Sequence, residues 1–240
     1  MGSPVFKFKQ FQINQSQCAM KITSDACVFG AYIDLSGAKK LLDIGTGTGL
    51  LSLMAAQRSK AEIHAVEIDQ LAFEQTTQNF ADSPWKQQII SHQGSIQSLI
   101  ETRSEQFAGQ FDTIITNPPF YSEAIKSKDK DKRNAWHDES LTYQELLDAS
   151  KKCLQKDGTL HVLIPTDRLD EYLRACRSLE LFPVKICNMK PFEHSDSHRV
   201  IISCKTCEMV VDSSELIIYR GHQDFSKEVR ELLSPYFLDV

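Results

Sequence analysis

The chain has 240 residues, of which 41% are hydrophobic and 25% are charged. These values are ordinary for globular proteins and exclude a disordered chain. No stretch approaches the roughly 18 uninterrupted apolar residues of a membrane-spanning helix, which excludes an integral membrane protein. The formal net charge of -5 argues against a protein coated by nucleic acid, but it leaves room for a local basic patch.

The amino terminus and the cysteines indicate a cellular compartment. The first ten residues carry charges where a secretory signal would be apolar. Together with seven cysteines, an odd number, this predicts reduced thiols and a cytoplasmic protein. Cys204 and Cys207 have C-x-x-C spacing, but no second Cys or His pair follows, and the surrounding VIISCKTCEMVV is typical of a strand. We therefore expect neither a metal site nor a redox motif.

The first predicted element is a short strand pair over residues 5–13, where apolar and polar residues alternate. The run Thr23-Ser24-Asp25 offers N-cap candidates for a helix over 26–35. From residue 39 onward, short apolar runs alternate with helical patterns. Strands are predicted at 39–44, 62–68, 86–92, 111–117 and 158–165, and helices at 50–59, 71–81, 140–155 and 167–179.

This alternation predicts an α/β fold in which helices cover both faces of a parallel sheet. Two further β-rich runs, at 184–189 and 198–205, are joined by a loop without a helical pattern, so we expect an antiparallel pair at one edge. Residues 224–233 predict a closing helix. No repeat or linker divides the chain. We expect one domain over 1–240, with an amino-terminal extension at 1–38, a core at 39–206 and a carboxyl-terminal strand and helix at 207–240.

A glycine-rich loop joins the strand at 39–44 to the next helix. The chain has only ten glycines, yet Gly45, Gly47 and Gly49 fall within five residues. Glycine lets the backbone turn sharply and lets a ligand lie against the main chain. The G-x-G-x-G spacing differs from the dinucleotide fingerprint and from the P-loop, and no Lys follows to meet a phosphate. The loop suits a ligand without a pyrophosphate.

Two further positions fit an adenosine ligand. Glu67 ends the second strand, where an acid can accept hydrogen bonds from both ribose hydroxyls. Asp69 can cap the following helix. After the third strand, Gly94-Ser95-Ile96 could place a polar side chain at the adenine edge.

These motifs resemble those of the Rossmann-like S-adenosylmethionine-dependent methyltransferases. DIGTGTG is similar to their first motif, EID to their second and GSI to their adenine-contact turn. The resemblance implies a class I methyltransferase fold: a seven-stranded, mostly parallel sheet with one antiparallel edge strand and helices on both faces. It also implies S-adenosylmethionine as cofactor, bound by Asp43, Gly45, Gly47, Gly49, Glu67 and Ser95.

The fourth strand runs into the tetrapeptide Asn117-Pro118-Pro119-Phe120. A strand beside the first one ends at the ligand crevice of such a sheet. The two prolines stiffen the turn and leave carbonyl oxygens exposed. The Asn117 amide oxygen and the Pro118 carbonyl can each accept one hydrogen of a planar NH2 group, and Phe120 can stack on its ring. The sequence predicts these three as catalytic residues acting on an amine.

The tetrapeptide resembles the (N/D/S)PP(Y/F/W) motif of amino-methyltransferases, which methylate adenine N6, cytosine N4 or glutamine amides. Glutamine methyltransferases of release factors carry a helical substrate domain, for which the 38 residues before Lys39 are too few. DNA adenine methyltransferases usually add a base-reading domain, for which we find no room. The motif specifies an NH2 acceptor without specifying which one.

A basic loop follows the tetrapeptide. Clustered cations beside the catalytic turn are suited to RNA phosphates, and an aromatic residue there could stack on an extruded base. A solvated loop partly balanced by Asp129 and Asp131 is the alternative. The predicted RNA contacts are Lys126, Lys128, Lys130, Lys132, Arg133 and Trp136.

A closer resemblance spans nearly the whole chain. The stretch from Gln17 to Asp25 followed by VFGAY is similar to the CAMK…TD…LGAW stretch of the bacterial tRNA adenine-N6 methyltransferases acting on position 37 of valine tRNA. KRNAWH and RELLSPYFL resemble two of their other segments. The resemblance implies that Lys21, Thr23 and Asp25 lie over the cofactor, with Lys21 near its carboxylate.

We therefore expect a monomeric enzyme that methylates N6 of an adenine in tRNA, with no metal and no membrane partner. An rRNA adenine methyltransferase, a protein glutamine methyltransferase and a non-catalytic cofactor-binding protein remain alternatives.

Overall fold

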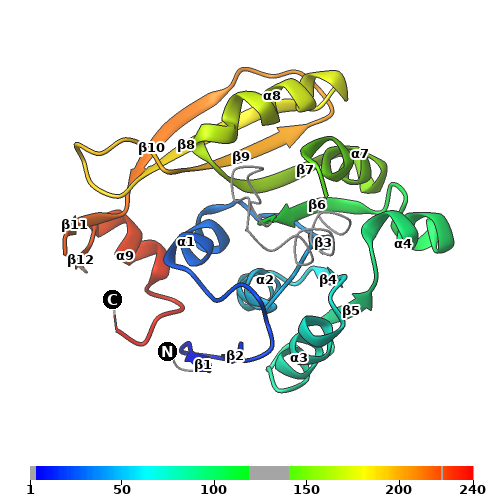
Figure 1. The fold of residues 1–240 in the computed structure, drawn as a ribbon, viewed down its shortest axis with the longest axis horizontal. Coiled ribbons are helices and arrows are strands. Elements are labelled where there is room, and N and C mark those ends of the chain that lie inside the picture. The colour runs from blue at the N-terminus through cyan, green and yellow to red at the C-terminus, as the bar shows by residue number, and fades with distance from the viewer. Residues whose placement is uncertain (1–3, 119–140, 223, 240) are drawn as a thin grey trace, which may run out of the picture.

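The computed structural model describes residues 4–118, 141–222 and 224–239. Its centre is an eight-stranded sheet in the order β10-β8-β9-β7-β6-β3-β4-β5 (Figure 1). The strands are β3 (Lys40–Ile44), β4 (Glu62–Glu67), β5 (Ile89–Gln93), β6 (Phe111–Thr116), β7 (Leu154–Pro165), β8 (Phe182–Lys190), β9 (Arg199–Lys205) and β10 (Asp212–Ile217).

The strand directions confirm an α/β fold with a mostly parallel sheet. β9 alone in this sheet runs against its neighbours, β7 and β8, while the other neighbouring pairs are parallel. Two details of the prediction are wrong: the sheet has eight strands rather than seven, and its antiparallel strand lies inside rather than at the edge. The reason is that β10 joins β8, where it pairs the backbone groups that an edge strand would leave open.

Helices cover both faces of the sheet, as expected (Figure 1). Leu41 and Leu42, neighbours on β3, point into two different hydrophobic clusters because side chains alternate along a strand. The first cluster takes buried side chains from α1 (Ser24–Tyr32), α2 (Leu50–Arg58), α3 (Gln70–Ala81) and α9 (Lys227–Leu233). The second takes them from α4 (Ile96–Thr102), α5 (Ser104–Phe107), α7 (Tyr143–Cys153) and α8 (Leu169–Ser178).

Smaller elements complete the fold. The predicted strand pair is confirmed as the antiparallel β1 (Val5–Lys7) and β2 (Gln12–Asn14). A second short pair, β11 (Tyr219–Gly221) and β12 (Asp224–Phe225), precedes α9, and a 3-10 turn at Thr166–Arg168 follows β7. None of the helices in the described ranges is long and apolar enough to cross a membrane.

Local capping chemistry sets the helix ends. Thr23 caps α1, since its hydroxyl accepts a hydrogen bond from the Ala26 N–H at 3.2 Å, as predicted. Asp69 caps α3 in the same way through the Ala72 N–H at 2.8 Å. The helix predicted over 140–155 is α7, which ends earlier because the chain enters β7 at Leu154.

The strand order reverses between β3 and β6, and this is where a ligand is expected. Connections from β3 lead to one side of the sheet through β4 and β5, and β6 and β7 continue on the other side. In such open sheets, ligands bind beyond the carboxyl ends of the strands where the order reverses. The Thr116 hydroxyl at the end of β6 donates to the Ile44 carbonyl at the end of β3, at 2.9 Å. We call the end of the sheet at which its parallel strands finish the carboxyl edge, which is distinct from the outer strands β10 and β5.

Candidate active site

The glycine loop follows β3 directly at the carboxyl edge. Gly45, Gly47 and Gly49 have φ values of 72°, 55° and 83°, a left-handed conformation that other residues rarely adopt. A Cβ atom added at Gly45 or Gly47 would meet nothing within 4 Å, whereas one at Gly49 would lie 2.6 Å from Cε1 of Phe80. Gly45 and Gly47 thus border open space that a ligand could fill, and Gly49 lets α3 pack closely.

Asp43, two residues before the loop, is fully buried. Its Oδ2 accepts hydrogen bonds from the hydroxyls of Thr46 and Ser52, each at 2.7 Å, which fixes the start of the loop. Its Oδ1 is buried without a hydrogen-bond partner among the described residues. Burial raises the pKa of the carboxyl to about 6, and the two hydroxyl hydrogen bonds oppose this increase. Asp43 thus fixes the start of the glycine loop through Oδ2, and its Oδ1 remains able to accept a hydrogen bond from a ligand.

Glu67, at the end of β4, ties the loop to the neighbouring strand. Its Oε2 accepts from the Gly47 N–H at 2.8 Å, and its Oε1 accepts from the N–H groups of Ile68 and Asp69. The acid predicted for ribose binding therefore lies directly beside the glycine loop. Ser95 is half-buried and caps α4, since its hydroxyl accepts from the Ser98 N–H at 3.1 Å. Its contact with adenine stays a prediction.

Asn117 follows β6, the strand that pairs with β3, and β3 leads into the glycine loop. Its side-chain oxygen is buried and has no hydrogen-bond partner in the described part of the chain. Pro118, the next residue, is buried. An unpaired buried acceptor is costly, since it has lost its water without gaining a donor. Such an atom at the carboxyl edge of β6 is suited to receive an N–H group from a ligand.

Comparisons with known proteins agree with this arrangement. The model of the methyltransferase small domain family matches residues 28–174. A tRNA1(Val) (adenine(37)-N6)-methyltransferase from Christiangramia forsetii is 38% identical, with 100% of both chains covered. One from Bacteroides thetaiotaomicron is 35% identical with the same coverage. The chain belongs to the methyltransferase small domain family.

Solved structures share the fold of this family member. A predicted O-methyltransferase from Agrobacterium tumefaciens matches with a TM-score of 0.68 at 18% identity, covering 88% of this chain and 96% of that one. TYW2 from Pyrococcus horikoshii, solved in complex with MeSAdo, matches with a TM-score of 0.53 at 14% identity, covering 81% of this chain and 67% of that one. At such identities the likeness establishes the fold alone.

An amino-terminal strap, residues 14–22, lies against the glycine loop. The Cys18 thiol is 3.6 Å from the Gly47 carbonyl oxygen. The Asn79 side chain on α3 accepts from the Asn14 N–H at 2.9 Å and donates to the carbonyls of Asn14 and Thr48, at 2.9 and 3.1 Å. Asn79 was not among the residues predicted from the sequence, and the signal that could have found it is an amide on the apolar face of an amphipathic helix, where a buried polar group needs partners.

Lys21 forms hydrogen bonds within the strap, and Thr23 caps the helix that follows it. The Lys21 ammonium donates to the carbonyl oxygens of Gln15 and Cys18, the latter at 2.9 Å, so it closes the strap on itself. Thr23 is exposed and caps α1. Their contacts with a cofactor stay predictions, and a cofactor carboxylate would have to compete with these carbonyls for Lys21.

Other predicted residues fall outside the described part of the chain. These are Phe120 and the residues of the basic loop: Lys126, Lys128, Lys130, Lys132, Arg133 and Trp136. Of the C-x-x-C pair, Cys204 is buried at the end of β9 and Cys207 is exposed. Among the residues that the structure describes, no group of three or more His, Cys, Asp or Glu could hold a metal ion.

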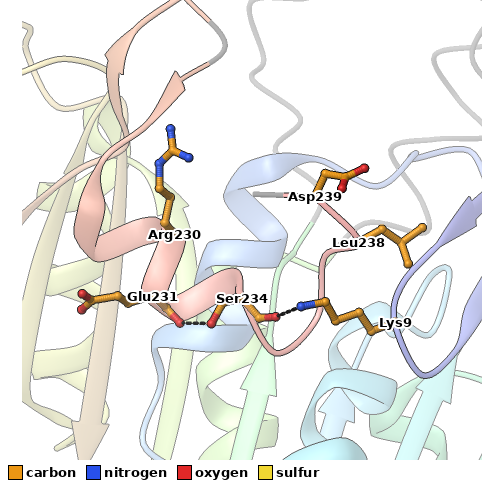
Figure 2. A pocket seen from close by; sticks show the side chains of 6 residues that line it. All are labelled: Lys9, Arg230, Glu231, Ser234, Leu238 and Asp239. Carbon is orange, nitrogen blue, oxygen red and sulfur yellow. Dashed lines mark hydrogen bonds between the residues drawn. The ribbon is translucent and has the colours of Figure 1, made fainter.

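A shallow depression of about 530 Å³ lies elsewhere, between the amino-terminal hairpin and α9. Figure 2 shows Lys9 reaching across it to the Ser234 carbonyl, at 2.7 Å. Its lining includes none of the residues predicted to bind cofactor or substrate. It therefore plays no part in the candidate active site.

Proposed function

We propose that this protein methylates the N6 amine of adenine 37 in the anticodon loop of valine tRNA, with S-adenosylmethionine as methyl donor. The observation that carries the proposal is the buried, unpartnered Asn117 Oδ1 at the carboxyl edge, across the switch point from the glycine loop. The full-length relatives named for this reaction support the choice of substrate.

Asn117 and Pro118 would activate the amine. The lone pair of an adenine amino group is delocalised into the ring, which makes the nitrogen a poor nucleophile. Two acceptors, Asn117 Oδ1 and the Pro118 carbonyl, would each take one N–H. This draws the nitrogen toward tetrahedral geometry, directs its lone pair and stabilises the positive charge that grows on it. Phe120 would stack on the base, which must leave the RNA stack to reach the crevice.

The residues around the glycine loop fit S-adenosylmethionine, which supplies an electrophilic methyl group when bound. Open space beside Gly45 and Gly47 allows a ligand to approach the backbone. The unpartnered Asp43 Oδ1 offers a buried acceptor. Glu67, whose carboxylate accepts from the Gly47 N–H, would also accept hydrogen bonds from a ribose. Contacts from Gly49, Ser95, Lys21 and Thr23 belong to the same proposal.

We infer a monomer acting on tRNA in the cytoplasm, without a resident metal or a membrane partner. We also infer that residues 1–240 form one domain in which the segment 1–38 covers the cofactor, 39–206 forms the core and 207–240 adds the last strand and helix. The strap contacts of Cys18 and Asn79 support the placement of the amino-terminal segment.

Methyl transfer from radiolabelled S-adenosylmethionine to separate pools of tRNA, rRNA and release factors tests this function. Nucleoside analysis should recover N6-methyladenosine from tRNA alone, and a valine tRNA with adenine 37 replaced by guanine should accept no label. Label in rRNA would instead indicate an rRNA adenine methyltransferase. Label in a release factor would indicate a protein glutamine methyltransferase. Cofactor binding with no label in any pool would leave a non-catalytic protein.

A further inference from the structure

A cluster of charged side chains lies at the carboxyl edge, two strands away from Asn117. Arg199 is the first residue of β9 and pairs with Pro165, the last residue of β7. β7 lies between β9 and β6, and Asn117 directly follows β6. Because β9 runs antiparallel to β7, its amino end meets the carboxyl ends of β6 and β7. Arg199 and Asn117 therefore lie at the same edge.

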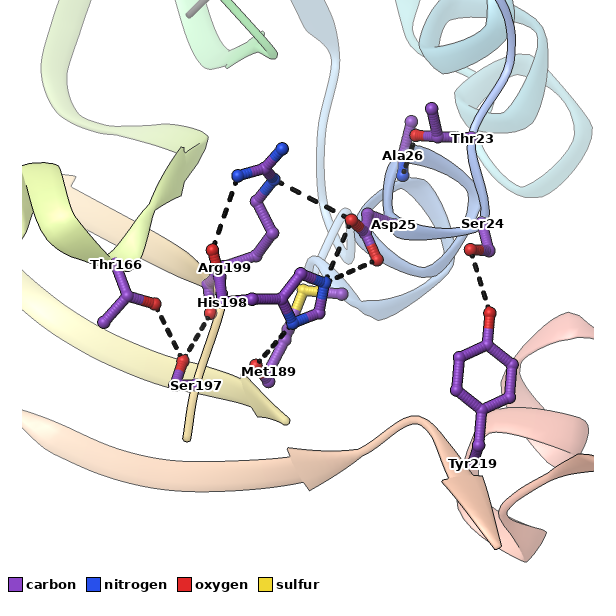
Figure 3. Close-up of polar contacts among 10 residues, drawn as sticks. All are labelled: Thr23, Ser24, Asp25, Ala26, Thr166, Met189, Ser197, His198, Arg199 and Tyr219. Atoms are coloured by element: carbon purple, nitrogen blue, oxygen red, sulfur yellow. Dashed lines mark hydrogen bonds and ion pairs between the residues drawn. The ribbon is translucent and has the colours of Figure 1, made fainter. Parts of the chain in front are cut away.

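Asp25, near the start of α1, holds the two basic side chains of this cluster. His198 Nε2 is 3.1 Å from each carboxylate oxygen of Asp25, and Arg199 Nε is 3.7 Å from Oδ2. The other ring nitrogen of His198 faces the Met189 carbonyl oxygen at 3.2 Å. Figure 3 shows both basic side chains converging on Asp25 from the start of β9. The cluster thus joins α1 to the far half of the sheet.

Hydroxyl groups hold the cluster from a third element. Thr166, just after β7, has its hydroxyl oxygen 2.9 Å from that of Ser197. The Ser197 hydroxyl in turn donates to the Arg199 carbonyl at 2.9 Å (Figure 3). The Thr166 N–H donates to the His198 carbonyl at 3.3 Å. The backbone that carries His198 and Arg199 is therefore braced by α1, β8 and the end of β7.

The Arg199 side chain of the cluster is partly exposed. The side chains of His198 and Arg199 are 37% and 30% exposed, and that of Asp25 only 21%. The two ring nitrogens of His198 lie beside the Asp25 carboxylate and the Met189 carbonyl, so the ring is held on both sides. The Arg199 guanidinium is therefore oriented by Asp25 and also accessible to solvent at the carboxyl edge.

We propose that Arg199, oriented by Asp25 and His198, binds a phosphate of the RNA strand next to the target nucleotide. The inference rests on the proposed function, because an adenine at Asn117 brings its own backbone to this edge. Arginine suits the task, since its planar guanidinium can donate two parallel hydrogen bonds to phosphate oxygens. Such contacts place the strand without reading its sequence. Arg199 is the binding residue, and Asp25 and His198 are positioning residues.

The test measures binding of an anticodon stem-loop RNA at several salt concentrations, together with S-adenosylmethionine binding by calorimetry. For Arg199→Gln we expect roughly tenfold weaker RNA binding, as for the loss of one charged hydrogen-bonded pair. The slope of log affinity against log salt should shrink by about one, the share of a single phosphate contact. Affinity for S-adenosylmethionine should stay unchanged. Arg199→Lys, which keeps the charge but not the planar fork, should keep the slope and lose part of the affinity.

Arg177→Gln is the matched control. It removes the same charge from an exposed position in the last turn of α8, a helix that leads away from the carboxyl edge, and it should leave the salt slope intact. Wild-type affinity and slope in Arg199→Gln, with tRNA still methylated by the wild type, would overturn this inference and spare the proposed function. A wild type that methylates no RNA would instead reject the proposed function.

Asp25→Asn separates orientation from simple charge. If Asp25 only lowered the local potential, its removal would tighten RNA binding and leave methyl transfer intact, and that result would reject its positioning role. We expect the reverse: kcat/KM for RNA falls because Arg199 loses its fixed direction. His198→Gln should reduce kcat/KM for RNA in the same way, while the KM for S-adenosylmethionine stays constant.

Discussion

The two halves of the carboxyl edge are built on different principles. In the β3–β5 half, carboxylates at the ends of two strands fix the glycine loop: Glu67 accepts from the Gly47 N–H, 20 residues away, and Asp43 accepts from the Thr46 hydroxyl, three residues away. In the β6–β9 half, the site is assembled from distant segments, as when Asp25 meets His198 across 173 positions. The first half forms a fixed cradle from one stretch of chain. The second half depends on the completed fold, because its side chains come from segments far apart in the sequence.

The largest expected effect comes from removing Asn117, whose side-chain oxygen is the unpaired acceptor of the β6–β9 half. Asn117→Ala should lower kcat by about 10²–10³-fold, the usual cost of losing one oriented group that stabilises developing charge. S-adenosylmethionine affinity, which depends on the other half, should change little. Single-turnover methyl transfer and calorimetry measure the two quantities. Near-wild-type turnover would remove Asn117 from the reaction.

Two glycines in the β3–β5 half should respond differently. Gly49→Ala forces a left-handed residue, at about 1–2 kcal/mol, and drives its Cβ into Phe80, at a further ~1–3 kcal/mol. Gly47→Ala meets the backbone cost alone, but places its methyl in the open space proposed for the cofactor. We therefore expect Gly49→Ala to unfold at lower urea concentration, and Gly47→Ala to bind S-adenosylmethionine more weakly. Equal effects in both assays would contradict the division of roles.

Asp43 gives the β3–β5 half a distinctive pH dependence. Its pKa is about 6 in the folded protein against an ordinary 3.8, so between these values the folded state holds a proton that the unfolded state has lost. Its contribution to the free energy of unfolding therefore decreases as pH rises through this window. Asp43→Asn cannot ionise and should gain up to ~3 kcal/mol above pH 6. Urea unfolding at pH 5 and pH 8 measures the change.

Two buried histidines supply the control for that measurement. Burial lowers the pKa of His92 and of His161 to about 4, so the unfolded state takes up protons first as pH falls below their ordinary 6.5. The two histidines therefore contribute to the free energy of unfolding above pH 6.5, and this contribution is lost on acidification. The contribution of Asp43 changes with pH in the opposite direction. Asp43→Asn should thus make acid destabilisation steeper. An unchanged slope would show that the Asp43 carboxyl does not titrate in this range.

The smallest effect should come from the strap. Asn79→Ala leaves the backbone groups of Asn14 and Thr48 without their amide partner, which should cost about 1 kcal/mol because water can reach part of the strap. If the strap covers the cofactor, the KM for S-adenosylmethionine should also rise while RNA affinity holds. Gln78→Ala, on the exposed side of the same helix, is the matched control. A rise in KM in both variants would point to α3 rather than to the strap.

The sequence predicted the β3–β5 half better than the rest, because its information is local. The glycine loop and the caps at Thr23 and Asp69 follow from patterns a few residues long. The placement of Arg199 beside Asp25, and the grip of Asn79 on the strap, depend on tertiary packing that no short pattern encodes. The same limit explains β10, whose sequence marks a strand but not the neighbour it pairs with.

The reversed direction of β9 has a consequence for how substrate choice can change. β8 and β9 form a hairpin whose connecting segment, 191–198, opens at the carboxyl edge, while both strands stay anchored in the sheet. Surface connections of this kind tolerate insertions and substitutions far better than the strands they join. Lengthening this hairpin tip within residues 191–196, before Ser197 and His198, would change which RNA shapes fit the β6–β9 half without disturbing the glycine loop on the opposite side.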